Sequence, residues 1–189
     1  MRTSNAMPHA NRLLTAEEFG DLDLEDGYRY ELVDGRVERV SPAKWRHGQI
    51  ATRILFALEA HARAHHLGET VIPTGFTLSR QPDTVREPDV AFIRSDCIPT
   101  EGLPDAFWPG APDLAVEVLS SSDRRGRIQR KLDDYLSRGV TLVWVVDPKK
   151  QTVTAYRRLS PPVVSGLDDT LEAPDLLPGF SVAVRDVFA

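Results

Sequence analysis

Cysteine is almost absent from this 189-residue sequence, in which Cys97 is the single example. One cysteine excludes an intrachain disulfide framework and any cysteine-rich zinc site. It also fits a reducing cytoplasm, which we expect to be the compartment of the protein. Long hydrophobic runs are missing as well. The longest, such as Leu142 to Val146, are far too short to span a bilayer, so we expect no membrane partner.

Glycine-rich phosphate-cradling loops are also missing, which disfavours a nucleotide hydrolase or phosphatase of that design. Basic residues are not in excess, because 23 Lys and Arg stand against 28 Asp and Glu, for a net charge of -5. This negative net charge argues mildly against broad, non-specific binding of nucleic acid, but it does not exclude a local basic groove. No secretory signal opens the chain. We expect residues 1–12 to be a disordered segment, in which "SNA" at residues 4–6 resembles an expression-vector remnant.

The sequence does contain the pattern of one α/β domain over residues 13–189. Thr15 and Glu18 predict a capping box that opens a short helix, and Asp34-Gly35 predicts a hairpin between "YRYELV" and "RVERVS". Apolar residues at helical spacing predict a helix from residue 45 to about 66, closed by Gly68. We then expect strands near "ETVIP", "GFTLS" and "VREPDVAFI", and a loop over residues 95–112.

The segment 113–147 predicts a strand–helix–strand unit, which favours parallel pairing of its strands. "DLAVEVL" is the best candidate for a buried strand, and an amphipathic helix with Leu132 and Tyr135 in its apolar stripe follows, ended by Gly139. "TLVWVVD" forms the second strand and "QTVTAYRRL" a hairpin partner for it. The tail reads as turns plus one strand.

Glu117 is unusual because it lies between Val116 and Val118 in the buried strand. Residues two apart share a face of a strand, so Glu117 lies with Ala115 and Asp113, whereas the valines point towards a core. Small Ala115 leaves room beside the two acids. We interpret Asp113 as the residue that starts the strand.

Two further acids are flanked by apolar residues in predicted strands, Asp89 in "EPDVAFI" and Glu31 in "YELV". Buried carboxylates close together need a compensating cation, and Mg2+ prefers a few carboxylates with water. If they converge, a divalent ion is the simplest explanation. Alternatively, each acid pairs with an arginine or lies at a solvated strand end. Shared ligation of one ion at ~2.1 Å requires the Asp89 and Glu117 carboxylates to lie within about 4 to 5 Å of each other.

Five basic residues stand between positions 124 and 131. On a helical wheel, Lys131 lies at the edge of the apolar stripe, so it can bury its stem and reach towards Glu117, whereas Arg130 points to solvent. A solvated basic helix flank is the alternative reading.

Together, "EPDVAFI", "PDLAVEVLS", "RKLDDYLSRGV" and "VWVVDP", with "YELVDGRV" before them and "LLPGFSV" after, resemble the bacterial Uma-type family of restriction endonuclease-like proteins within the PD-(D/E)xK nuclease superfamily. The resemblance runs from about residue 13 to the C-terminus. It implies a restriction-endonuclease-like α/β (α+β) fold, with a central mixed sheet flanked by helices and with additional hairpins.

The resemblance implies roles for specific residues. Asp89 and Glu117 take the places of the metal-binding acids, and Glu31 that of an early acid that also binds metal. The usual lysine two residues after the second acid is replaced by Leu119, which points to Lys131 as a catalytic lysine supplied by the next helix. His47 falls where the family carries a histidine, although a lone histidine at a helix start is more often structural.

The activity expected is hydrolysis of DNA phosphodiester bonds with Mg2+, or with Mn2+, by a homodimer. The phosphate-binding residues would be Arg124, Arg125 and Arg127. A catalytically silent protein of the same fold, which binds DNA or a protein partner, is the alternative. Carboxylates of Asp89 and Glu117 on different faces would favour this silent binder.

Overall fold

The computed structural model describes residues 12–100, 102, 106–120 and 125–189, so the expectation for residues 1–12 falls almost wholly outside the described part. Thirteen strands and four helices are assigned there, with one 3-10 turn at Ser95–Cys97. The helices are α1 (Ala16–Gly20), α2 (Trp45–Ala64), α3 (Arg125–Ser137) and α4 (Val184–Phe188).

One sheet has five strands in the order β2-β1-β5-β4-β7. Its strands are β1 (Arg29–Val33), β2 (Arg36–Val40), β4 (Phe76–Ser79), β5 (Thr84–Arg86) and β7 (Trp108–Pro109). The predicted β1–β2 hairpin is present, with Asp34 and Gly35 at φ 49° and 72°, the left-handed region that such a two-residue turn requires. The predicted capping box of Thr15 and Glu18 opens α1, which packs beside this sheet.

The central sheet has six strands in the order β11-β10-β9-β8-β6-β3. β8 and β9 are parallel, while the remaining pairs are antiparallel, so the sheet is mixed as expected. Its strands are β3 (Gly68–Val71), β6 (Val90–Arg94), β8 (Leu114–Val118), β9 (Leu142–Asp147), β10 (Thr152–Tyr156) and β11 (Val163–Ser165). A separate hairpin joins β12 (Thr170–Glu172) to β13 (Ser181–Ala183).

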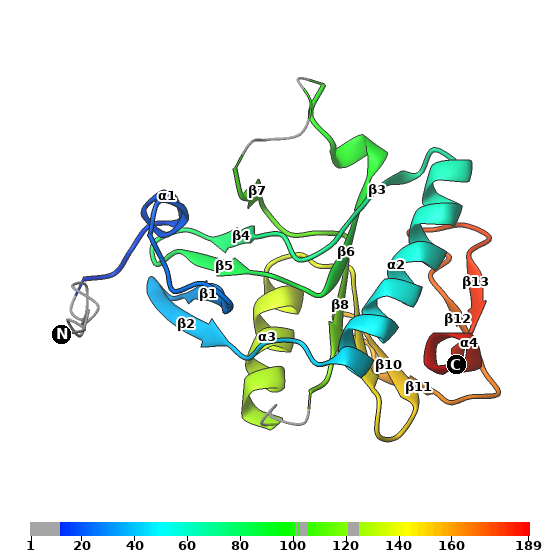
Figure 1. The fold of residues 1–189 in the computed structure, drawn as a ribbon. Coiled ribbons are helices and arrows are strands. Elements are labelled where there is room, and N and C mark those ends of the chain that lie inside the picture. Colours follow the sequence, from blue (N-terminus) through cyan, green and yellow to red (C-terminus); the bar gives the residue numbers. More distant parts are fainter. Residues whose placement is uncertain (1–11, 101, 103–105, 121–124) are drawn as a thin grey trace.

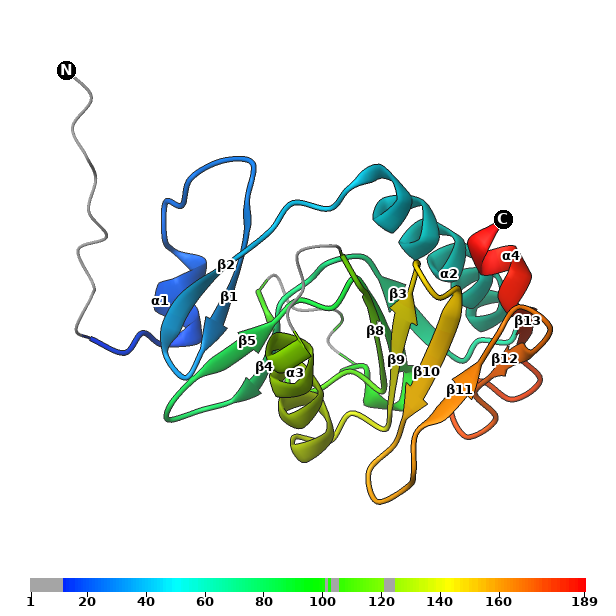
Figure 2. The same ribbon diagram turned by 90° about the horizontal axis from the view of Figure 1, so that it is seen from below.

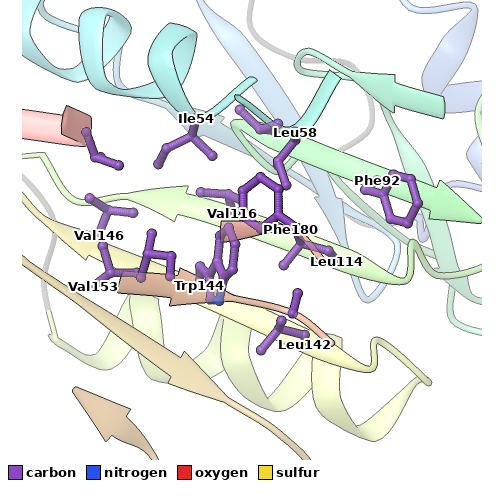
Figure 3. Close-up of a cluster of buried hydrophobic side chains, with 14 of the residues drawn as sticks. Ile54, Leu58, Phe92, Leu114, Val116, Leu142, Trp144, Val146, Val153 and Phe180 are labelled. Atoms are coloured by element: carbon purple, nitrogen blue, oxygen red, sulfur yellow. The ribbon is translucent and has the colours of Figure 1, made fainter. Parts of the chain in front are cut away.

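Helices cover both faces of the central sheet (Figures 1 and 2). α2 presents Ile50, Ile54 and Leu58 to one face, where they meet Val116 and Trp144 (Figure 3). Burial of each such side chain contributes about 1.5 to 3 kcal/mol relative to exposure. α3 covers the other face, where Leu132 and Tyr135 pack on Ala115, Val143 and Val145. Both faces of β8 are therefore buried, whereas we expected only one to face a core.

The predicted strand–helix–strand unit is confirmed as β8–α3–β9 (Figure 2). The predicted stop at Gly139 is also present: Gly139 has φ 104°, and the amide of Val140 donates back to the carbonyl of Tyr135. This unit fixes the side chains of α3 against one face of the sheet, directly beside Glu117.

Three local expectations were wrong. α2 ends with His66 in the left-handed conformation at φ 53°, and not with Gly68, which begins β3 instead. Gly68 is needed for a close approach, because a Cβ atom there would lie 2.0 Å from the carbonyl oxygen of Ile93. "VREPDVAFI" is two strands, β5 and β6, in different sheets, since Pro88 interrupts the strand at their junction. The tail holds a two-stranded hairpin and α4, more than the single strand expected.

Within the described residues, no helix combines the length and the apolar character that crossing a membrane requires.

Candidate active site

A small pocket lies where the five-stranded sheet, the start of α2, the central sheet and α3 meet. It measures about 30 Å³, room for roughly one or two water molecules or an ion. Asp89, Glu117 and Lys131 all line it, with His47 and Arg29. Asp89 and Glu117, which come from different segments of the chain, therefore share one pocket and do not point to different faces.

Glu117, at 6% exposure, is held by two groups of α3. Lys131 Nζ lies 2.8 and 2.9 Å from its two carboxylate oxygens. The hydroxyl of Tyr135, one helical turn further on, donates to Glu117 Oε1 at 2.6 Å. These contacts confirm the predicted reach of Lys131 towards Glu117. Lys131 and Tyr135 are four residues apart, so they lie on one flank of the helix and contact the same carboxylate.

Glu31 lies behind Lys131 and is completely buried. Its Oε1 accepts from Lys131 Nζ at 2.9 Å and from the amide of Glu87 at 3.1 Å. Its Oε2 accepts from Arg86 Nη1 at 2.8 Å. Glu31 is not among the residues that line the pocket, but it contacts the same Lys131 Nζ as Glu117 does.

Arg86 extends this buried network away from the pocket. Besides Glu31, it contacts Asp134 Oδ2, 2.9 Å from Nε and 2.5 Å from Nη2. Asp134 in turn accepts from Arg138, four residues later on α3. Because β5 and α3 are thereby joined through one guanidinium, the network fixes α3 in relation to the acids.

Asp89 lies just before β6 and accepts three hydrogen bonds. One oxygen accepts from the amide of Val118 at 2.9 Å and lies 2.8 Å from His47 Nε2. The other oxygen lies 3.2 Å from Arg29 Nη1. His47 is on the same side of α2 as buried Ile50, which explains why it points inward. Glu87, two residues before Asp89, lines a different pocket, although alternation along a single strand would put the two side chains on one face.

The charges of this cluster act on one another. Burial opposes ionisation of Glu31, but the positive charges of Lys131 and Arg86 outweigh it and lower its pKa to about 2. Burial raises the pKa of Glu117 to about 7, and the Asp89 and Glu31 carboxylates add to the rise against the opposing charge of Lys131. Burial also opposes the charge on Lys131, yet Glu117 and Glu31 outweigh it and raise its pKa. Lys131 is therefore a cation at neutral pH.

The pocket fits a divalent ion of the Mg2+ type. Such an ion takes one or two carboxylates and fills its remaining positions with water and substrate phosphate, and Asp89 and Glu117 supply two carboxylates facing one cavity. Nδ1 of His47, a residue that lines the pocket, is buried and has no hydrogen-bond partner in the described structure, whereas buried polar atoms usually have one. The described residues contain no cluster of three or more His, Cys, Asp or Glu side chains that could hold a metal ion by themselves.

Among the arginines predicted to hold phosphates, Arg127 lines the pocket and donates to the carbonyl of Arg39 at 3.4 Å. Arg124 and the side chain of Arg125 lie outside the described residues. Arg130 is on the surface as expected, paired with Glu38 at 3.0 Å. The alternative in which acids pair with arginines is also partly realised, in Asp89–Arg29 and Glu31–Arg86.

Sequence reasoning missed three side chains of the site: Arg29, Arg86 and Tyr135. Tyr135 was assigned to the core stripe of its helix, although its spacing of four from Lys131 was a usable signal. Arg86 follows Val85 in a predicted strand and immediately precedes "EPD", and an arginine that is buried there needs an acidic partner. Arg29 is two residues before Glu31, so the alternation of side chains along the predicted strand puts both on one face.

Two comparisons relate this chain to nuclease-like proteins. A solved structure described as a putative nuclease belonging to DUF820 from Anabaena variabilis ATCC 29413 superposes with a TM-score of 0.81 at 21% sequence identity, and the match covers 93% of this chain and 97% of that one. At that identity, the match shows a shared fold. The Uma2 family, described as "Putative restriction endonuclease", matches residues 16–185, and the chain belongs to this family. No curated protein matches it.

Proposed function

We propose that the protein hydrolyses phosphodiester bonds of DNA with the help of a divalent metal ion, in the pocket of Asp89, Glu117 and Lys131. The observation that carries this proposal is the convergence of these three side chains on one cavity in a member of the Uma2 family. Two acids can hold a divalent ion that assists phosphodiester hydrolysis, and a cationic lysine beside them can stabilise the charge that develops on the phosphate.

Asp89 and Glu117 would hold the ion, Mg2+ or Mn2+. When bound, it polarises a phosphoryl oxygen and lowers the pKa of water. Asp89 is preorganised for this role, because the Val118 amide and His47 fix its orientation. We assign His47 this orienting role. For Glu31, which does not line the pocket, we propose that it positions Lys131 and does not ligate the metal.

Lys131 contributes as a cation. Its raised pKa makes it a poor base, so it stabilises negative charge that develops on the phosphate, or donates a hydrogen bond to the leaving oxygen. Glu31, which is itself bonded to Arg86, contacts its ammonium group and helps to keep it in place. Arg127, at the rim of the pocket, would hold a neighbouring backbone phosphate.

The direct test is a plasmid-nicking assay in Mg2+, Mn2+ or Ca2+ with the purified wild type and the variant Glu117→Gln. We expect the wild type to nick supercoiled DNA with Mg2+ or Mn2+, and Glu117→Gln to lose this activity while its circular dichroism spectrum is unchanged. The surface variant Glu38→Gln should behave as the wild type. Equal nicking by wild type and Glu117→Gln would exclude this site.

Cutting of both strands generally needs two active sites, so we also propose a homodimer, which analytical ultracentrifugation tests. A protein that binds DNA without nicking it under any of these ions would instead be the silent binder.

A further inference from the structure

Two arginines of the site differ sharply in how much of their hydrogen-bonding capacity is used. Arg86 is 1% exposed and makes three contacts of 2.5 to 2.9 Å to two carboxylates. Among the described residues, Arg29 makes a single hydrogen-bonded ion pair, 3.2 Å from Nη1 to Asp89, and its side chain is 27% exposed. Charge-assisted bonds of arginine are usually 2.7 to 2.9 Å long, so the Arg29–Asp89 contact is a loose one.

Arg29 also differs in its position. It lines the pocket that Asp89, Glu117 and Lys131 share, whereas Arg86 lies outside that pocket. A guanidinium group carries five N–H donors in a fork that matches phosphate geometry. With one donor engaged, Arg29 offers the others to an anion that enters the cavity.

The charge balance of the pocket indicates when that anion can enter. Two carboxylates, Asp89 and Glu117, and three basic side chains, Arg29, Lys131 and Arg127, line it. Arg29 contacts Asp89, and Lys131 contacts Glu117. A divalent cation on the acids would supply the positive charge that Arg29 now gives to Asp89, and would repel the guanidinium from it.

We propose that Arg29 binds a phosphate of the nucleic-acid backbone, and that a divalent cation at Asp89 frees it to do so. This inference rests on the proposed function, because it names how the same site takes its substrate. Arg29 thus serves as a stand-in cation for Asp89 when the metal is absent. Metal ion and nucleic acid then bind cooperatively.

Binding, measured apart from cleavage, tests the idea. Fluorescence anisotropy of a labelled DNA duplex is followed in EDTA and in Ca2+, for the wild type, Arg29→Met and Arg29→Lys, at several salt concentrations. We expect Ca2+ to tighten binding by the wild type, and Arg29→Met to weaken binding in Ca2+ by about 10-fold or more. The slope of log affinity against log salt should fall by about 0.9, the value of one lost phosphate contact. Arg29→Lys should restore most of the slope.

The affinity for Ca2+ alone, from isothermal titration calorimetry, should change in the opposite direction. Arg29→Met removes a cation that competes with the metal, so the affinity for Ca2+ should rise by on the order of 10-fold. If Arg29 were only structural, its loss would weaken the binding of both Ca2+ and DNA. Arg130→Met, which removes a surface arginine of α3 paired with Glu38, should leave both affinities unchanged.

An unchanged salt slope in Arg29→Met, or weaker Ca2+ binding, would overturn the inference. Nicking by the wild type combined with normal DNA binding by Arg29→Met would refute the role of Arg29 while sparing the proposed function. Tight, Ca2+-dependent, Arg29-dependent binding without nicking would refute the nuclease activity and keep the role of Arg29.

Discussion

The ammonium group of Lys131 lies between two buried carboxylates, 2.8 Å from Glu117 Oε1 on one side and 2.9 Å from Glu31 Oε1 on the other. The three residues come from α3, β8 and β1. A lysine held in this way keeps both its charge and its direction, because either acid alone would restrain only one side of it.

Replacing Lys131 by methionine should reduce the nicking rate by roughly 100- to 1000-fold, the usual cost of losing one donor that stabilises developing charge. The variant should also be less stable by about 3 to 5 kcal/mol at neutral pH, because Glu31 and Glu117 lose their shared cation. Nicking kinetics and urea denaturation measure the two effects. Arg130→Met, one position away on the surface, is the control, and a Lys131→Met rate within threefold of the wild type would contradict the role.

The raised pKa of Glu117 makes stability depend on pH. The folded protein keeps this group protonated up to about pH 7, whereas the unfolded chain releases the proton near pH 4.5. The free energy of unfolding should therefore fall as pH rises from 4.5 to 7, by about 3 kcal/mol from this group. Urea denaturation at several pH values should show this decline in the wild type and in Glu38→Gln, but a much flatter profile in Glu117→Gln.

Glu31 acts in the opposite sense at lower pH. Its lowered pKa, about 2, contributes stability above pH 4.5 that is lost as the pH falls towards 2.

Equal pH profiles for the wild type and Glu117→Gln between 4.5 and 7 would show that Glu117 is ionised in the folded protein.

Arg86→Met should destabilise the fold by about 3 to 5 kcal/mol, because it leaves Glu31 and Asp134 without a shared cation in the interior. Chemical denaturation measures the loss. The matched control is Arg185→Met, which breaks an exposed ion pair with Asp168 and should cost less than about 1 kcal/mol. Similar losses in the two variants would mean that the buried network contributes little.

Tyr135→Phe should leave the buried ring packed and remove one donor to Glu117, at a cost of about 1 kcal/mol in stability. Because the hydroxyl favours the ionised carboxylate, its loss should raise the pKa of Glu117 further. The pH at which the nicking rate reaches half of its maximum should then increase, by roughly half a unit to one unit. Tyr30→Phe removes a more distant hydroxyl, 3.5 Å from the carbonyl of Glu25, and should leave that pH unchanged.

Much of the fold could be predicted from sequence because local chemistry specifies it. The Asp34-Gly35 turn, the capping box of α1 and the amphipathic stripe of α3 each depend on neighbouring residues. The end of α2 could not be predicted in this way. Gly68 is required by its contact with the carbonyl of Ile93, which lies in a different strand, so the sequence near Gly68 does not reveal why it is there.

The candidate site shows the same division. The alternation of side chains along a strand and the helical wheel predicted that Lys131 reaches Glu117, since each rule concerns one regular element. Neither argument could place Glu31 behind Lys131, out of the pocket, because that depends on how the five-stranded sheet meets α3. The junction between the two sheets also falls inside "VREPDVAFI", so Glu87 and Asp89 line different pockets.

The origin of Lys131 on a helix has one further consequence. A lysine two residues from Glu117 on the same strand would be held near it by the covalent chain. Here the distance between them is set by the packing of α3 on the sheet, through Leu132 and Tyr135. The site is therefore a reporter of tertiary order: a partly denatured, still compact state that keeps its helices and strands but loosens their packing would already be inactive.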